Sequence, residues 1–277
     1  MPELPEVETI ARTLAPSLVG RVIAGIDLIY RPLLRGGRPG RLRGLIGRRV
    51  LGVRRRGKML LVEIEGGRTL VFHLKMTGQF LFAAASEPRD KHIRLAIQFE
   101  DGRNELRFGD VRKFGFLLCL EGAPERSSGE LSSLGPEPLE VGLSVFADIL
   151  KARRGRIKSL LLDQTRIAGI GNIYADEMLF DARIHPETRA NSLTKPSIAR
   201  LYQSMKKILS EAIEAKGSTL QDYRDADGNE GSFQESHKVY DREGEPCLAC
   251  GTPVKMKRIG GRSSHFCPRC QRKRPSR

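Results

Sequence analysis

Two pairs of cysteines near the C-terminus, Cys247-Leu248-Ala249-Cys250 and Cys267-Pro268-Arg269-Cys270, decide the fold of the last segment of the chain. Each pair directs two thiolates at one ion, and pairs separated by 16 residues are typical of tetrahedral zinc sites. Because all four ligands are sulfur, no coordination position stays open for water. The spacing therefore predicts one structural Zn2+ that holds a hairpin, with Gly260-Gly261-Arg262-Ser263 as the turn between two short strands.

The composition indicates a water-soluble protein of the cell interior. The sequence has no run of about 20 apolar residues, which a membrane-spanning helix would need. No signal peptide precedes the opening Pro-Glu. Five cysteines in such a chain do not indicate a disulfide framework. The fifth, Cys119, lies in an apolar strand-like run and is predicted to be a small core residue. We therefore expect a cytoplasmic protein.

Positive charge points to a polyanionic partner. The 277 residues include 48 Lys and Arg against 33 Asp and Glu, a formal net charge of +15. Residues 31–58 contain eleven Lys or Arg, residues 251–277 contain nine, and neither stretch contains an acid. Two basic stretches so far apart predict a groove lined from both sides, although a solvated basic face would have the same composition. Neither stretch repeats as an amphipathic helix, which disfavours a membrane surface.

Periodicity predicts a β-rich first half. Apolar residues at helical spacing indicate an amphipathic helix over residues 6–18, and short runs rich in β-branched and aromatic residues follow it. Seven runs are predicted strands: residues 22–29, 50–53, 59–65, 69–74, 92–99, 105–108 and 114–120. Their number and spacing indicate a sandwich or a barrel preceded by a helix.

The second half is predicted to be helical. Pro, Ser, Gly and Glu gather in residues 122–141, which indicates a linker. Helices are predicted over residues 144–152, 157–163, 172–180 and 197–216, before a glycine-containing acidic loop or lid at residues 217–234. The predicted fold class is α+β with two domains and a zinc finger. Its parts are a β-sandwich domain at 1–122, a linker at 123–143, a helical domain with the lid at 144–235 and the zinc hairpin at 236–277.

The chain opens Met1-Pro2-Glu3, a terminus that becomes reactive if Met1 is removed. Position 2 then carries a free secondary amine beside a carboxylate. An α-amino group has a pKa near 8, about two units below a lysine side chain, so part of it is unprotonated at neutral pH. Such an amine attacks an electrophilic carbon and forms an iminium ion, with Glu3 placed to move protons. The alternative is a Met-Pro start with no chemical role.

One predicted helical corner carries residue types suited to a phosphate group. Ala168-Gly169-Ile170-Gly171-Asn172 joins two predicted helices, and Asn172 is predicted to cap the second, whose first N–H groups point outward. The basic residues predicted around this corner are Arg154, Arg156, Lys158 and Arg166. They favour binding to a DNA backbone over an ordinary helical corner.

Two predicted turns in the β-rich half carry exposed-looking apolar side chains. In His73-Leu74-Lys75-Met76-Thr77-Gly78, an exposed Met76 beside basic residues suits a wedge inserted between bases. In Asp110-Val111-Arg112-Lys113-Phe114-Gly115, a cation and an aromatic ring share a turn. Periodicity alone favours the alternative that Met76 and Phe114 are buried.

Taken in order, these motifs resemble the bacterial formamidopyrimidine-DNA glycosylase family, called MutM, within the group that includes endonuclease VIII. The resemblance covers essentially the whole chain. Its carriers are Pro2-Glu3-Leu4-Pro5-Glu6-Val7-Glu8, Arg55-Arg56-Gly57-Lys58, His73 to Gly78, Arg112-Lys113-Phe114-Gly115, Leu134-Gly135-Pro136-Glu137-Pro138-Leu139, Asp163-Gln164 with Ala168 to Glu177, Gly217-Ser218-Thr219-Leu220, and the zinc segment with Arg262. Each motif is weak alone, whereas eight in one order are specific.

The resemblance implies a monomeric DNA-repair enzyme of the bacterial cytoplasm, in which a helix-two-turns-helix element and a zinc hairpin grip damaged double-stranded DNA. It implies a glycosylase that is also an abasic-site lyase. Pro2 attacks C1′ and expels the base, and the resulting Schiff base permits β- and δ-elimination. Glu3 protonates the sugar ring oxygen and later moves protons. Lys58 matches a proton donor in β-elimination, although a phosphate contact would equally explain it, and Arg262 matches the arginine of δ-elimination.

The resemblance also implies a set of DNA contacts. These match His73, His92, Arg112, Arg154 and Asn172, and the group that fills the gap left by the extruded base matches Met76, Arg112 and Phe114. Any of Lys151, Arg153 and Arg156 lies close enough in sequence to take the role of Arg154.

Two positions depart from the family pattern. Lys75 precedes Met76 where the family more often has glycine or arginine. It adds a phosphate contact or alters how Met76 enters the base stack. Val111 stands where proline is expected before Arg112, which loosens the turn that aims the arginine.

Three alternatives differ in substrate or in chemistry. An endonuclease VIII-like enzyme would prefer oxidised pyrimidines, whereas Leu4-Pro5 and the loop at residues 222–233 favour the formamidopyrimidine type, whose main substrates are 8-oxoguanine and ring-opened purines. A non-catalytic lesion-binding protein would retain Met1 or carry a blocked Pro2. A zinc-ribbon protein that binds RNA or ribosomes would explain the basic tail but gives Pro2-Glu3 no role.

Overall fold

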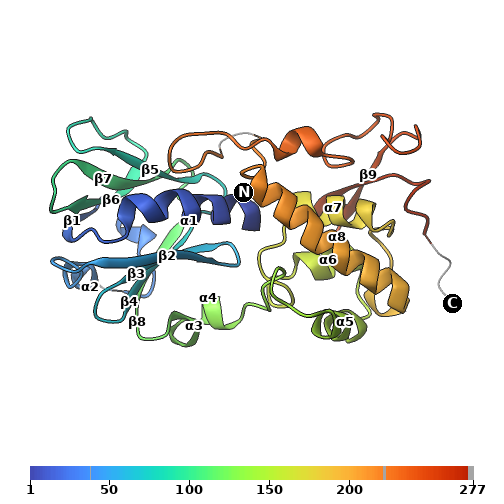
Figure 1. Cartoon of the computed structure of the whole chain (residues 1–277), viewed down its shortest axis with the longest axis horizontal. Helices are drawn as coiled ribbons and strands as arrows, with labels where there is room; N and C mark the ends of the chain where they lie inside the picture. The colour runs from blue at the N-terminus through green and yellow to red at the C-terminus, as the bar shows by residue number, and fades with distance from the viewer. Residues whose placement is uncertain (38, 221–222, 274–277) are drawn as a thin grey trace. The chain divides into compact units, whose positions relative to one another are not determined.

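The computed structural model describes residues 1–37, 39–220 and 223–273, which form two compact units (Figure 1). The N-terminal unit comprises Met1–Ser133 and Ala215–Gln234, and the helical unit comprises Leu134–Glu214 and Glu235–Arg277. Residues 38 and 274–277 of the basic stretches and residues 221–222 of the predicted lid lie outside the described residues. Within the described ranges, no helix is long and apolar enough to cross a membrane.

The N-terminal unit begins with helix α1 (Leu4–Leu18), two residues earlier than the periodicity predicts. Glu3 is the N-cap and forms a capping box with Glu6: the Glu3 carboxylate accepts from the Glu6 N–H, and Glu6 Oε2 accepts from Glu3 N at 2.7 Å. This reciprocal pair satisfies N–H groups that a helix start leaves open. The apolar face of α1 is buried against both sheets of the unit.

Two four-stranded antiparallel sheets form the β-sandwich. Their strand orders are β1-β6-β7-β5 and β2-β3-β4-β8. The bounds are β1 (Ile23–Leu28), β2 (Val50–Arg56), β3 (Met59–Ile64), β4 (Arg68–His73), β5 (Gly78–Ala84), β6 (Ile93–Phe99), β7 (Asn104–Asp110) and β8 (Phe116–Glu121). Phe72, Phe80 and Phe108 pack ring against ring between the sheets, with centroids 5.0–5.6 Å apart. The sandwich is therefore the correct one of the two predicted architectures.

The sequence does not predict β5. This strand starts at a glycine and ends in alanines, so its apolar alternation is short, and the preceding turn hides its beginning. It pairs with β7 from Gly78 opposite Asp110 to Ala84 opposite Asn104. The turn before β5 is consequently fixed at the edge of the sandwich.

Four shorter elements lie in segments without a predicted structure. They are η1 (Arg31–Leu33), α2 (Gly40–Arg43), α3 (Pro124–Ser127) and α4 (Gly129–Ser132). The last two lie in the predicted linker, whose C-terminal part belongs to the helical unit. Gly135 N donates to Gln164 O at 2.9 Å, and a Cβ at Gly135 would lie 2.4 Å from the carbonyl of Arg166. Only glycine allows the chain to pass so close.

The helical unit contains α5 (Leu143–Lys151), α6 (Ile157–Leu162), α7 (Asn172–Asp181), η2 (Ala190–Ser192), α8 (Lys195–Glu214) and η3 (Phe233–Ser236), whose first residues lie in the N-terminal unit. The side chain of Gln164 organises the two turns between α6 and α7. Its Oε1 accepts from Gly169 N at 2.8 Å, and its Nε2 donates to Leu162 O at 3.0 Å and Ile170 O at 2.8 Å. These bonds build the helix-two-turns-helix element.

The predicted lid packs on the N-terminal unit, whereas the sequence places it with the helices. Tyr223 and Ala226 join the core around α1. The Tyr223 hydroxyl donates to Lys216 O at 3.0 Å, and Ala226 N donates to Thr13 Oγ1 at 3.4 Å. The apolar side chains of the loop find their partners about 210 residues earlier in the sequence, as the separation of 213 between Ala226 and Thr13 illustrates.

Candidate metal centre and nucleic-acid interface

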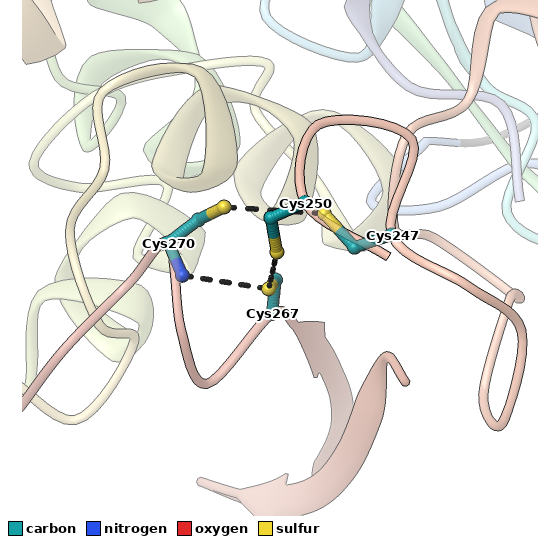
Figure 2. Close-up of side chains that lie close together, drawn as sticks. All are labelled: Cys247, Cys250, Cys267 and Cys270. Carbon is teal, nitrogen blue, oxygen red and sulfur yellow. Dashed lines mark hydrogen bonds between the residues drawn. The ribbon is translucent and has the colours of Figure 1, made fainter. Parts of the chain in front are cut away.

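The four paired cysteines converge on one point (Figure 2). Their sulfur atoms all lie within 4.8 Å of one another, with Cys250 and Cys267 Sγ 3.5 Å apart and Cys247 and Cys270 Sγ 4.0 Å apart. Zinc–sulfur bonds of about 2.3 Å in a tetrahedron place sulfurs about 3.8 Å apart. The cluster therefore fits a single structural Zn2+, as predicted. Cys119 is a buried core residue, also as predicted.

The zinc hairpin consists of β9 (Lys255–Ile259) and β10 (Arg262–Phe266). Its turn is shorter than predicted and contains Gly260 and Gly261, with φ angles of 56° and 78°. Two consecutive left-handed residues are what a tight hairpin turn requires, and glycine adopts them without strain. Arg262 is thereby the first residue of β10, paired with Ile259, and its side chain is exposed.

A buried ion pair anchors the hairpin to the helices. Lys158 Nζ contacts Asp176 Oδ1 at 2.5 Å and donates to Ser263 O at 2.9 Å, while Asp176 Oδ2 accepts from His265 N at 2.9 Å. Both side chains of the pair are fully buried. The expectation that Lys158 joins the basic surroundings of the corner is therefore wrong, because its charge is neutralised inside the unit.

Asn172 lies at the start of α7 but does not cap it. Gly171 is the N-cap, in an extended conformation, and Asn172 is the first helical residue. Its Nδ2 donates to Ser263 Oγ at 3.3 Å, which places Asn172 against the residue that follows Arg262. The structure thus brings Asn172 and the start of β10 together, a contact that the sequence does not predict.

A second buried acid of α7 positions the segment before the zinc site. The Glu177 carboxylate accepts from Lys238 N, Val239 N and Tyr240 N at 2.8–3.0 Å. Burial raises the pKa of Glu177, and these three N–H groups oppose the shift. Sequence reasoning missed both acids of α7. The sequence signal that could have found them is the pair of adjacent acids between the apolar residues of the predicted helix.

Arg154 is exposed in the turn between α5 and α6. Of the neighbours that could replace it, Lys151 donates to Asn191 O at 3.1 Å and Leu193 O at 2.6 Å. Arg156 lies 3.8 Å from Glu187. Arg153, like Arg154, is exposed. All four residues are exposed, and the two hydrogen bonds of Lys151 favour Arg154 over Lys151 as a residue that meets a partner.

In the N-terminal unit, the buried Asp110 carboxylate joins two turns at one end of the sandwich. Its Oδ1 accepts from Thr77 Oγ1 at 2.5 Å, and its Oδ2 accepts from Gly115 N at 2.7 Å. Thr77 Oγ1 in turn accepts from Arg112 N at 3.1 Å. This arrangement needs no proline at position 111. Sequence reasoning missed Asp110 because its partners lie 33 residues away and across the turn.

Met76, Arg112 and Phe114 meet at the tips of these turns. Arg112 Nη1 lies 3.1 Å from Met76 Sδ, and Arg112 Cζ lies 4.9 Å from the Phe114 ring centroid. Met76 and Phe114 are 47% and 50% exposed. Burial, which periodicity alone favours, is therefore wrong for both, because Phe114 precedes β8 and Met76 precedes β5. The three side chains form an apolar and cationic projection.

His73 and Lys58 lie near this projection. Met59, which follows Lys58, pairs with His73 across β3 and β4. Burial and the neighbouring cations Lys75, Lys58 and Arg35 lower the pKa of His73 to about 3, so its imidazole is neutral at pH 7. His73 Nδ1 accepts from Lys75 N at 3.0 Å, which leaves the proton on Nε2. His73 therefore presents a neutral N–H donor.

His92 lies beside the same end of the sandwich. Its carbonyl accepts from Asp110 N at 3.0 Å, and its Nδ1 lies 3.4 Å from Arg94 Nη2. Arg94 Nε in turn donates to Asp110 O at 2.9 Å, so Arg94 connects the half-buried ring to Asp110. The structure accordingly gathers the predicted contacts of this unit, His73, Met76, His92, Arg112 and Phe114, at one end of the two sheets.

Pro2 and Glu3 are buried at the start of α1, whereas Met1 is exposed. The two oxygens of the Glu6 carboxylate bind the terminus and a distant segment. Besides the bond from Glu3 N, its Oε1 accepts from Ser218 N at 2.8 Å. A Cβ at Gly217 would lie 2.7 Å from Glu6 Oε1, so this approach depends on glycine. The terminus and the loop at residues 217–233 are therefore linked through one carboxylate.

Comparison with known proteins gives matches along almost the entire chain. Three family models match it: the formamidopyrimidine-DNA glycosylase N-terminal domain over residues 1–117, the formamidopyrimidine-DNA glycosylase H2TH domain over residues 134–224, and the zinc finger found in FPG and IleRS over residues 244–272. The chain is 48% identical over 274 residues to the formamidopyrimidine-DNA glycosylase of Solibacter usitatus, a match that covers 99% of this chain and 100% of the relative.

Solved structures of proteins with the same family name are also similar over almost the whole chain. The MutM (Fpg) protein of Thermus thermophilus is 45% identical, with a TM-score of 0.88 over 99% of this chain and 100% of that chain. Lactococcus lactis Fpg in complex with DNA containing an abasic site is 38% identical, with a TM-score of 0.91 over 98% of this chain and 100% of that chain. The Lactococcus lactis protein is also known in complexes with DNA containing N7-benzyl-Fapy-dG and DNA containing an oxidised pyrimidine.

We predict that Cys247→Ser abolishes stoichiometric zinc binding and loosens the hairpin, because a four-thiolate site couples metal binding to local folding. Metal analysis should find about one zinc per native chain and much less in the variant, and limited proteolysis should cut the variant within residues 244–272. Cys119→Ala, which removes a buried thiol outside the cluster, should keep its zinc. Full zinc content in Cys247→Ser would contradict the assignment of this cysteine.

Proposed function

The chain belongs to the formamidopyrimidine-DNA glycosylase family, and on this premise we propose that it is a bifunctional glycosylase and abasic-site lyase that removes oxidised purines from double-stranded DNA in base excision repair. The observation that carries the proposal is the buried Pro2-Glu3 terminus, held in place by Glu6. The bacterial relatives of this chain support a cytoplasmic location for the proposed enzyme.

Removal of Met1 would turn the Pro2 nitrogen into a secondary amine. That amine attacks C1′ of the damaged nucleoside, the C1′–N bond to the base breaks, and the base leaves with the bonding electron pair and a proton. Glu3 supplies a proton to the sugar ring oxygen, which opens the ring and yields the iminium ion. Loss of a C2′ proton and departure of the 3′ phosphate then constitute β-elimination. A second elimination, with Arg262 as its proposed assistant, releases the 5′ phosphate.

The geometry of each unit supports some of the remaining proposed contacts. The side chains of Met76, Arg112 and Phe114 contact one another and are exposed, as a wedge that fills the gap left by an extruded base must be. The Nε2–H of His73 and the neighbouring Lys58 suit backbone phosphates, and the proton-donor role of Lys58 in β-elimination remains part of the proposal. His92, Arg154 and Asn172 complete the proposed DNA contacts, with zinc supplying only the shape of the hairpin.

Oxidised pyrimidines are a second candidate substrate class, because a similar protein is known in complex with DNA containing one. The loop at residues 223–233 is the proposed reader of purines. It is less open than its sequence suggests: Asp225 Oδ1 accepts from Asp227 N and Asn229 N, and Asn229 Nδ2 donates to Asp225 Oδ2. The tip is therefore ordered by one buried carboxylate, and its amide groups are engaged within the loop.

We predict that Pro2 is the nucleophile. An uncleaved N-terminal tag should abolish trapping of a covalent complex by borohydride on 8-oxoguanine duplexes, whereas Pro2→Gly should keep part of it because a primary amine remains. Intact-protein mass spectrometry must show that Met1 is absent from the active preparation. A tagged protein that traps as well as the native one would refute the amine mechanism and favour a different nucleophile.

For Glu3 we expect a role in base release. Glu3→Gln keeps an oxygen that accepts from the Glu6 N–H, so the helix start should survive, but it removes the transferable proton. Single-turnover excision of 8-oxoguanine should fall by a factor of about 100 or more, within the range of general acid catalysis, with a much smaller loss at a preformed abasic site. Equal losses on both substrates would mean that Glu3 only supports the fold.

For the loop we predict a selective loss of base recognition. Asp225→Ala frees the N–H groups of Asp227 and Asn229 and should disorder the tip. The ratio of 8-oxoguanine excision to abasic-site cleavage should fall about tenfold, which corresponds to about 1.4 kcal/mol. Asp227→Ala, whose side chain is exposed, is the control. An unchanged ratio would exclude the ordered tip as a reader, and a native preference for oxidised pyrimidines would favour the endonuclease VIII-like alternative.

A further inference from the structure

Two cations in the N-terminal unit, Arg35 and Lys75, have no part in the chemistry described above, and both lie beside His73. Arg35 Cζ lies 4.2 Å and Lys75 Nζ lies 5.5 Å from the centroid of the Phe116 ring. The imidazole of His73 lies against the same ring, with the two centroids 5.3 Å apart. Two cations and a neutral imidazole thus share one buried aromatic side chain.

Backbone contacts hold these groups in place. Arg35 N donates to Leu117 O at 2.9 Å, and Leu34 forms a parallel bridge with Leu117. His73 and Phe116 are paired residues of β4 and β8. The remaining member, Lys75, is tied to His73 by the bond from its own N–H to Nδ1. The cluster is therefore set by the sheet and its neighbouring turns rather than by long side chains that happen to meet.

The cluster is electrostatically suited to an anion. Burial and the charge of Arg35 both lower the pKa of Lys75, which shows that like charges lie near one another. Contacts with the face of Phe116 offset part of that repulsion. The neutral His73 adds an Nε2–H donor without adding charge. A guanidinium, an ammonium and an imidazole N–H together match the several oxygens of a phosphate group.

The backbone of Lys75 makes glycine a suitable replacement for a test. Its φ angle is 53°, in the left-handed region where a residue with a Cβ is strained by about 1 kcal/mol and glycine is not. The chain nevertheless carries a lysine there, directly before the exposed Met76. Glycine would fit this backbone at least as well, so Lys75→Gly removes the cation without straining the turn.

We propose that Arg35, Lys75 and His73 form a site on Phe116 that binds one phosphodiester group of the DNA strand next to Met76. This inference rests on the proposed function, because the phosphate belongs to the DNA that Met76 enters. It gives Lys75 the first of its two expected roles, an added phosphate contact, and it gives Arg35 a role that the sequence did not suggest.

The test measures duplex affinity as a function of salt for Arg35→Gln, Lys75→Gly and the double variant. The duplex carries a stable abasic-site analogue, so that cleavage does not interfere. Each single variant should bind about five- to tenfold more weakly, and the slope of log K against log salt should fall by about 0.9 in the double variant, the value for one phosphate. Arg103→Gln and Arg126→Gln remove the same charge from exposed positions elsewhere in the unit and should leave the affinity nearly unchanged.

Glycine suits the backbone conformation at position 75, so the melting temperature of the Lys75→Gly variant should not fall. A weaker complex with DNA then reflects the lost cation. An unchanged slope and affinity in the double variant, with binding and excision intact in the native protein, would overturn this inference and leave the proposed function standing. A slope loss near 1.8 would mean two separate phosphates and would overturn the single site. Inorganic phosphate that shifts the His73 nitrogen resonances while the slope stays unchanged would identify a small-anion site instead. Failure of the native protein to bind or cut damaged duplex would refute the proposed function itself.

Discussion

Within each unit, buried carboxylates accept hydrogen bonds from segments that are distant in the sequence, and these bonds hold the segments in place. In the N-terminal unit, Glu6 accepts from Glu3 N and from Ser218 N, 212 residues away, and Asp110 joins the turns that precede β5 and β8. In the helical unit, Asp176 and Glu177 bind the zinc hairpin and the segment before it. All four are at most 2% exposed, so water cannot supply the donors. Each acid therefore fixes the segments that surround it.

This constraint explains how irregular segments carry a defined site. A hydrogen bond to a charged group contributes about 1.5–3 kcal/mol, and a buried carboxylate without donors would cost more. The turns that hold Met76 and Phe114 are therefore tied to the end of β7 through Asp110. The Lys158–Asp176 pair differs, because burial of two opposite charges costs about as much as their attraction returns. We infer that this pair specifies where the hairpin lies against α6 and α7 more than it adds net stability.

Much of the fold could be predicted from the sequence, because its signals are local. Helical periodicity locates α1 and the four longer helices of the second unit to within a few residues, and the cysteine spacing alone identifies the metal centre. Two of the misses share a physical cause, a partner that is distant in the sequence. Whether Lys158 is a surface cation or half of a buried pair depends on Asp176, 18 residues away, and whether the loop belongs with the helices depends on the packing of Tyr223 and Ala226 on α1. Turn chemistry was the better guide for Met76 and Phe114, because periodicity does not register where a strand begins.

The return of residues 215–234 to the N-terminal unit has a consequence for synthesis on the ribosome. The sandwich and α1 emerge first, yet their core contains Tyr223 and Ala226. Until those residues emerge, α1 presents an apolar surface that the completed chain covers, and the Glu6 carboxylate lacks the Ser218 donor. Much of the helical unit must therefore be translated before the first unit can close. A fragment that ends after β8 would be an incomplete folding unit, although the strands of its two sheets are all present.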